Sequence, residues 1–202
     1  FQPRLDVFDQ HKFMFVGCCV AESVRREEEL QLDDDPTLRE LLDAFDPVNP
    51  IENVVEESAS EKLVYVSLGT VFNNNAFVFD ALLDAVKLLE GRVRIRALFA
   101  VGKQVIKEYE ASGKVVPGNV ILRAFVPQLA VLRRARAFVT HCGMNSISEA
   151  VHYAVPVVCV PIQADQPLVA ERVCDELRLG RRFDPMRLDA HELANGLYEV
   201  LT

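Results

Sequence analysis

The chain has 202 residues, half of them hydrophobic and about a quarter charged, which suits a globular protein with a full core. Its formal net charge of -8, without a lysine and arginine cluster, argues against a nucleic-acid-binding surface. The sequence shows no apolar run long enough to cross a bilayer and no signal-peptide pattern. The five cysteines form no CxxC pair, so we expect reduced thiols and a cytoplasmic location.

The first 61 residues divide into two parts. Residues 1–20 contain the strand-like run KFMFVGCCV, and residues 21–61 form an acidic linker with several prolines. Within the linker, DPTLRELLDAF predicts a short amphipathic helix, because Asp35 suits the N-cap and Pro36 suits the first turn. Its apolar residues recur at helical spacing: Leu38, Leu41, Leu42 and Phe45.

From residue 62 the chain alternates between strand-like and helix-like segments. The predicted strands lie in residues 63–69, 93–102, 119–125, 137–140, 155–161 and 180–184. The predicted helices lie in residues 77–90, 128–135, 143–154, 166–177 and 188–201. This alternation predicts an α/β fold, a Rossmann-like doubly wound parallel sheet with helices on both faces, preceded by the acidic linker.

Polar or aromatic residues follow four of the predicted strands. These segments are Gly69-Thr70, Phe125–Gln128, His141–Gly143 and Ile162–Gln166. In an open parallel sheet, ligands bind beyond the carboxyl ends of the strands. We therefore expect these segments to meet at one edge of the sheet and form a ligand site.

The helix predicted after His141 suits a phosphate. Its first turn offers unpaired backbone N–H groups and the positive end of the helix dipole, and Gly143 lets an anion approach the backbone closely. Asn145 and Ser146 can donate hydrogen bonds to phosphate oxygens from the same turn. Glu149 lies one turn further on the face of Asn145 and could accept hydrogen bonds from a ribose diol.

A second polar pair, Asp165 and Gln166, suits the hydroxyls of a sugar. The predicted ligand is thus anionic, with a ribose on one side of its phosphates and a sugar on the other. Simpler interpretations exist for each residue: helix capping for the serine, asparagine and aspartate residues, a structural role for His141, and a core position for Phe125. Zinc is disfavoured, because His141-Cys142 has no further ligand at suitable spacing.

Two other nucleotide-binding classes are excluded by their motifs. A dinucleotide oxidoreductase needs a G-x-G-x-x-G turn after its first strand, whereas SLGTVFNNN has a single glycine. A P-loop is also absent from the sequence.

Residues 62–184 resemble the C-terminal, nucleotide-sugar-binding domain of the family 1 UDP-glycosyltransferases, which have the GT-B fold of two facing Rossmann-like domains. The segments VSLGTVFNNN, FVPQLAVL, FVTHCGMNSISEA and VPIQADQPLVAERV carry the resemblance, which is strongest to the macrolide-glycosyltransferase-like branch. Residues 1–17 resemble the end of the N-terminal domain. The implied organisation is a tail of the N-terminal acceptor domain (1–20), an acidic linker with a short helix (21–61), and a UDP-sugar-binding domain (62–202).

The resemblance implies a role for each candidate residue. Phe125 would stack on uracil, with Val126 and Gln128 beside the base, and Glu149 would hold the ribose hydroxyls. The diphosphate would be bound by Thr70, His141, Gly143, Asn145 and Ser146. Asp165 and Gln166 would meet the donor sugar. Phe125 and Met144 stand where plant members have tryptophan.

The family's catalytic base is a histidine of the N-terminal domain, and none of His11, His141, His152 and His191 matches it, so we assign no catalytic residue here. The family needs no metal, and UDP-sugar is a substrate rather than a cofactor. We therefore expect the donor domain of an inverting glycosyltransferase that transfers a hexose to a small lipophilic or phenolic acceptor, inactive without its acceptor domain. The alternatives are a separate donor-binding subunit of a two-chain lipid-linked sugar transferase, and a sugar-nucleotide sensor.

Overall fold

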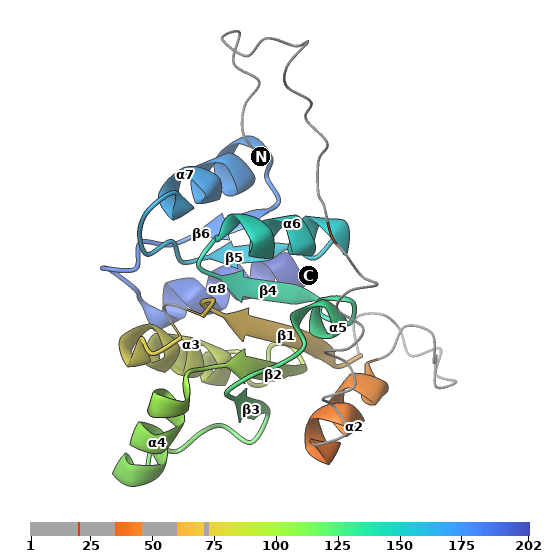
Figure 1. Cartoon of the computed structure of the whole chain (residues 1–202), viewed down its shortest axis with the longest axis vertical. Helices are drawn as coiled ribbons and strands as arrows, with labels where there is room; N and C mark the ends of the chain where they lie inside the picture. Colours follow the sequence, from red (N-terminus) through yellow and green to blue (C-terminus); the bar gives the residue numbers. More distant parts are fainter. Residues whose placement is uncertain (1–19, 21–34, 46–59, 71–72) are drawn as a thin grey trace, which may run out of the picture.

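A computed structural model describes residue 20 and residues 35–45, 60–70 and 73–202 (Figure 1). The strand-like run before residue 20, the tail predicted around it and the acidic run between residues 21 and 34 lie outside the described residues.

The described residues form a six-stranded parallel sheet, which confirms the predicted fold class. Its strands are β1 (Lys62–Ser67), β2 (Ile95–Ala100), β3 (Val120–Arg123), β4 (Ala137–Thr140), β5 (Val157–Cys159) and β6 (Gly180–Arg182). Their order across the sheet is β3-β2-β1-β4-β5-β6. The order reverses between β1 and β4, and in doubly wound sheets the ligand crevice lies at this reversal.

Helices connect the strands. They are α2 (Pro36–Ala44), α3 (Ala76–Leu88), α4 (Lys103–Ser112), α5 (Gln128–Leu132), α6 (Met144–His152), α7 (Gln166–Glu171), the π-helical η2 (Arg172–Glu176) and α8 (Ala190–Leu201). Helix α4 was not predicted from the sequence; it begins after Gly102, and its C-cap residue Gly113 has a left-handed backbone conformation. The helix predicted over residues 166–177 is α-helical only to Glu171 and continues as η2.

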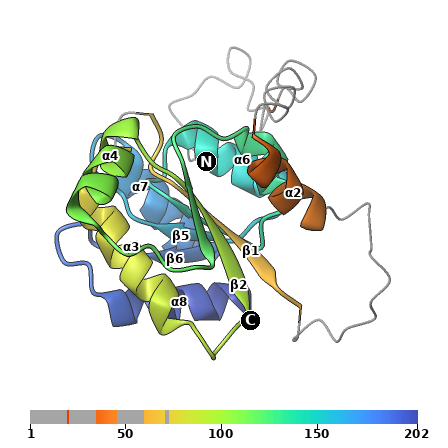
Figure 2. The same cartoon turned by 90° about the horizontal axis from the view of Figure 1, so that it is seen from below.

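The sheet has a hydrophobic core on each face, because successive strand residues point to opposite sides. Val64 and Val66 of β1 pack in one core with α3, α4 and α8. Leu63 and Tyr65 pack in the other core with α2, α5, α6 and α7. Figure 2 shows α3 and α8 on one side of the sheet and α2 and α6 on the other.

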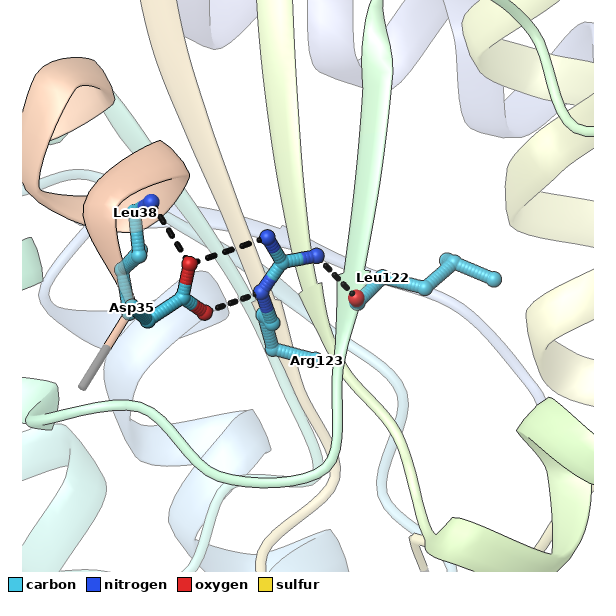
Figure 3. Close-up of polar contacts among 4 residues, drawn as sticks. All are labelled: Asp35, Leu38, Leu122 and Arg123. Carbon is cyan, nitrogen blue, oxygen red and sulfur yellow. Dashed lines mark hydrogen bonds and ion pairs between the residues drawn. The ribbon is translucent and has the colours of Figure 1, made fainter.

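The short helix α2 is attached to the sheet domain by buried leucines and by an ion pair. Asp35 caps the helix as predicted, since its Oδ1 accepts a hydrogen bond from the backbone N–H of Leu38 at 3.0 Å. The same carboxylate forms an ion pair with Arg123 at the end of β3 (Figure 3). As predicted, one face of the helix is apolar, and its buried residues are Leu38, Leu41 and Leu42.

Candidate nucleotide site

A cavity of about 460 Å³ lies at the carboxyl ends of β1, β2, β3 and β4, beside the point where the strand order reverses. Every residue predicted to bind UDP lines it: Thr70, Phe125, Val126, Gln128, His141, Gly143, Asn145, Ser146 and Glu149. The parallel topology therefore brings residues from four separate segments of the chain to one cavity.

The imidazole of His141 lies between two glycines. A Cβ atom on Gly69 would stand 2.6 Å from Cε1 of this ring, and a Cβ atom on Gly143 would stand 2.6 Å from Nε2. Glycine at both positions therefore leaves the space that the ring occupies. Burial holds the pKa of His141 below its usual value, while the negative charge of Asp165 opposes that shift. The lowered pKa favours the neutral imidazole, in which one ring nitrogen can donate a hydrogen bond and the other can accept one.

Helix α6 begins at this cavity with its backbone donors available. Its N-cap residue, Gly143, has no side chain that could cap the helix, and its first turn carries no acidic residue. Asn145 and Ser146 come after the N-cap, so the simpler interpretation of these residues as N-caps does not apply. The first turn of α6 thus combines a positive dipole end with polar side chains, which favours an anion.

A network of buried polar side chains forms one wall of the cavity. The amide Nε2 of Gln128 donates to Oε2 of Glu149 at 2.5 Å and to Oγ of Ser146 at 3.4 Å. The hydroxyl of Tyr65 donates to Oε1 of Gln128 at 3.1 Å. Glu149 and Ser146 are 6% and 9% exposed, so these hydrogen bonds offset the cost of burying polar groups.

Phe125 is the exposed aromatic residue of the cavity. It follows the end of β3, and 57% of its surface is accessible, so it is not the core aromatic of the simpler interpretation. Val126, beside it, is buried. An exposed ring at the edge of a cavity with polar groups is suited to stack on a flat heterocycle.

Asp165 and Gln166, which were predicted to meet the donor sugar, are not among the described residues that line this cavity. Oε1 of Gln166 accepts hydrogen bonds from the backbone N–H groups of Ile162 and Gln163, at 2.8 and 3.0 Å. This oxygen therefore stabilises the loop that precedes α7. Asp165 is exposed, and within the described structure its side chain makes no capping hydrogen bond to α7. Its charge acts on His141, which places it within electrostatic reach of the cavity.

Three polar residues of the cavity were not predicted from the sequence: Tyr65, Ser67 and Asn73. Tyr65 and Ser67 stand within the apolar run of β1, where they are taken for core residues. The signal that could have found them is their spacing, because residues two apart in a strand share one face. Asn73 belongs to the three-asparagine run that precedes α3.

A larger cavity of about 920 Å³ lies at the opposite edge, beside the amino ends of β5 and β6, and contains none of the predicted residues. Among the described residues, no group of three or more His, Cys, Asp or Glu side chains is arranged to hold a metal ion. The helices of the described segments are all too short or too polar to span a membrane.

Comparison with known proteins places the chain in a family. Residues 44–202 match the sequence profile described as "UDP-glucoronosyl and UDP-glucosyl transferase". The chain belongs to the UDP-glycosyltransferase family. It is 31% identical over 201 residues to YojK of Bacillus subtilis (strain 168), named as an uncharacterized UDP-glucosyltransferase; the match covers all of this chain and 42% of that protein.

Solved glycosyltransferases share the fold of this domain, which is the Rossmann-like C-terminal half of the GT-B fold. The crystal structure of the glycotransferase of kitacinnamycin has a TM-score of 0.61 and 31% identity, over 72% of this chain and 36% of that chain. Os79 from O. sativa, in complex with UDP, has a TM-score of 0.56 and 28% identity, over 69% of this chain and 32% of that chain. The chain thus spans less than half the length of these relatives.

Proposed function

We propose that this chain binds a UDP-sugar as the donor domain of an inverting glycosyltransferase. The observation that carries the proposal is the cavity at the switch point of the sheet, which combines an exposed aromatic ring, an uncapped helix N-terminus and a buried carboxylate. These three features match the base, the diphosphate and the ribose of a UDP-sugar. The UDP bound to the similar Os79 supports the same ligand.

In this proposal Phe125 stacks on uracil beside Val126 and Gln128, and Glu149 accepts hydrogen bonds from the ribose. The diphosphate meets the N-terminus of α6 and a set of polar groups from Thr70, His141, Asn145 and Ser146. When an acceptor oxygen attacks the anomeric carbon of the sugar, the bond to the diphosphate breaks and negative charge grows on the leaving UDP. The helix dipole and the N–H donors stabilise that charge, so we propose that the reaction needs no metal.

The base that deprotonates the acceptor belongs, in this proposal, to an acceptor domain outside this chain. The acceptor would be a small lipophilic or phenolic molecule and the sugar a hexose. The alternative of a separate donor-binding subunit uses the same site and differs in whether both domains share one polypeptide. The cytoplasmic location stays a prediction, consistent with the free thiols of Cys142, Cys159 and Cys174.

Calorimetric titration of the 202-residue chain tests the proposal. The chain should bind UDP. In a coupled assay for UDP release it should liberate no UDP from a UDP-sugar in the presence of phenolic acceptors. Glu149→Ala should weaken UDP and UDP-sugar binding alike by at least about tenfold, because a charge-assisted hydrogen bond contributes about 1.5–3 kcal/mol. Glu199→Ala, which removes a carboxylate paired with Arg181 away from the cavity, is the matched control and should leave UDP binding unchanged. Unchanged UDP binding by Glu149→Ala would contradict the ribose assignment, and acceptor-dependent turnover would show that the base lies within this chain.

A further inference from the structure

The hydrogen-bond network beneath the cavity connects β1, α5 and α6, and each hydrogen bond is donated towards α6. It starts at the hydroxyl of Tyr65 on β1, passes through the side-chain amide of Gln128 on α5, and ends at Glu149 and Ser146 on α6. Tyr65 is 1% exposed and also lines the cavity. Its residue type is unusual among the other buried strand residues of this core, which are aliphatic apart from Phe138 and Cys159.

The amide of Gln128 can satisfy its neighbours in one orientation only. A carboxylate accepts hydrogen bonds, so Glu149 requires the NH2 end of the amide, and the oxygen end then faces Tyr65. Burial raises the pKa of Tyr65, so its hydroxyl stays protonated and available as a donor to that oxygen.

The ring of Tyr65 is itself held in place. It stacks on Phe138 of the neighbouring strand, with ring centroids 4.8 Å apart and an angle of 10° between the planes. The two residues are direct neighbours in the register of β1 and β4. The phenol is therefore a fixed point on the central strand, against which the amide of Gln128 is oriented.

We propose that Tyr65 is a positioning residue for the ribose of the bound nucleotide, acting through Gln128 to fix the carboxylate of Glu149 at the cavity. The inference rests on the proposed function, since it assumes that Glu149 meets the ribose. Tyr65 itself need not touch the nucleotide. Removing its hydroxyl should release the amide of Gln128 and let the carboxylate of Glu149 take other orientations, which weakens its hydrogen bonds to a diol.

The experiment compares two ligands and three proteins. Calorimetry measures the affinity of the wild-type chain, Tyr65→Phe and Tyr109→Phe for UDP and for 2′,3′-dideoxy-UDP, which lacks the ribose diol. Tyr65→Phe keeps the ring and its stacking, and should weaken UDP binding about fivefold while leaving dideoxy-UDP binding unchanged. Tyr109→Phe removes a hydroxyl that donates to Asp80 at 2.6 Å outside the cavity, and should change neither affinity.

The pattern of affinities separates the possible failures. Equal losses for both nucleotides in Tyr65→Phe would show a general structural role and overturn the inference, as would an unchanged preference for UDP over dideoxy-UDP. If the wild-type chain binds UDP and dideoxy-UDP equally well, the ribose assignment of Glu149 is wrong and the inference with it. A wild-type chain that binds neither nucleotide would overturn the proposed function itself.

Discussion

Asp35 makes two separate interactions that a pair of substitutions can distinguish. Its Oδ1 caps α2 by accepting from Leu38 N–H at 3.0 Å, and its two oxygens accept from Nε and Nη2 of Arg123 (Figure 3). Asp35→Asn keeps the cap, because asparagine is as good an N-cap as aspartate, but removes the charge opposite Arg123. Asp35→Ala removes both interactions.

The expected magnitudes follow from exposure and from typical energies. The side chains of Arg123 and Asp35 are 30% and 27% exposed, which favours a contribution of about 1 kcal/mol from the ion pair. The cap contributes about 1 kcal/mol more. Detachment of α2 should therefore become easier by about 1 kcal/mol in Asp35→Asn and by about 2 kcal/mol in Asp35→Ala. These values correspond to amide exchange that is about 5 and about 30 times faster in α2.

Hydrogen exchange followed by mass spectrometry measures this opening, with peptides of α8 as the internal reference. The pKa of Asp35 lies below its usual value, chiefly because of the hydrogen bond from Arg123. The stabilisation should thus be present above the unfolded pKa of about 3.9 and be lost as the pH falls through the lower folded pKa. Asp35→Asn should lack this acid dependence. Equal exchange in both variants would show that the cap contributes nothing, and wild-type exchange in Asp35→Ala would refute the whole argument.

Two further substitutions test the cavity. In Gly143→Ala the new Cβ would stand 2.6 Å from Nε2 of His141, so thermal unfolding should show a loss of stability of about 1–3 kcal/mol and calorimetry a weaker affinity for UDP. Gly118→Ala, with open space around it, should change neither quantity. A Gly143→Ala variant as stable as the wild type would contradict the packing of His141. Asp165→Ala should lower the pKa of His141 further, as followed by NMR titration of the imidazole, and should weaken binding of UDP-sugar but not of UDP. An unchanged imidazole titration would place Asp165 too far away to act, and equal losses for both ligands would defeat the donor-sugar assignment.

The fold could be predicted because most of its elements are encoded locally. Runs such as residues 63–69 are apolar, rich in valine and end in glycine, which is sufficient to identify a central strand. Helix α4 was missed because its only buried residues are Val105 and Tyr109, and its exposed face dominates the sequence pattern. The change from α7 to η2 at Arg172 was also missed, because a π-helical segment of 5 residues is too short to interrupt the helical pattern of the sequence.

The gathering of the candidate UDP-binding residues at one cavity could be predicted, because they follow strands whose carboxyl ends meet at one edge of a parallel sheet. Ser146 and Glu149 stand out as polar residues on the buried side of α6, whose other buried residues are Ile147 and Ala150. The spacing of Tyr65 and Ser67 could have placed both on one face of β1, but the contact between Tyr65 and Gln128 could not be predicted, because the two residues are 63 positions apart and only the folded sheet brings their polar atoms together. Long-range hydrogen bonds of this kind leave no periodic signal in a single sequence.

The burial of the polar residues divides the cavity into two parts with different physical roles. Ser67, Ser146 and Glu149 are buried, and hydrogen bonds from Gln128 hold Ser146 and Glu149 in place. Phe125 and Thr70 are exposed and can contribute stacking area and adaptable contacts. In the proposed function, where Glu149 meets the ribose, binding should thus require little ordering of this wall of the cavity. We therefore expect selectivity for a ribose to depend on Tyr65 and Gln128 beneath the cavity as well as on the residues that touch the ligand.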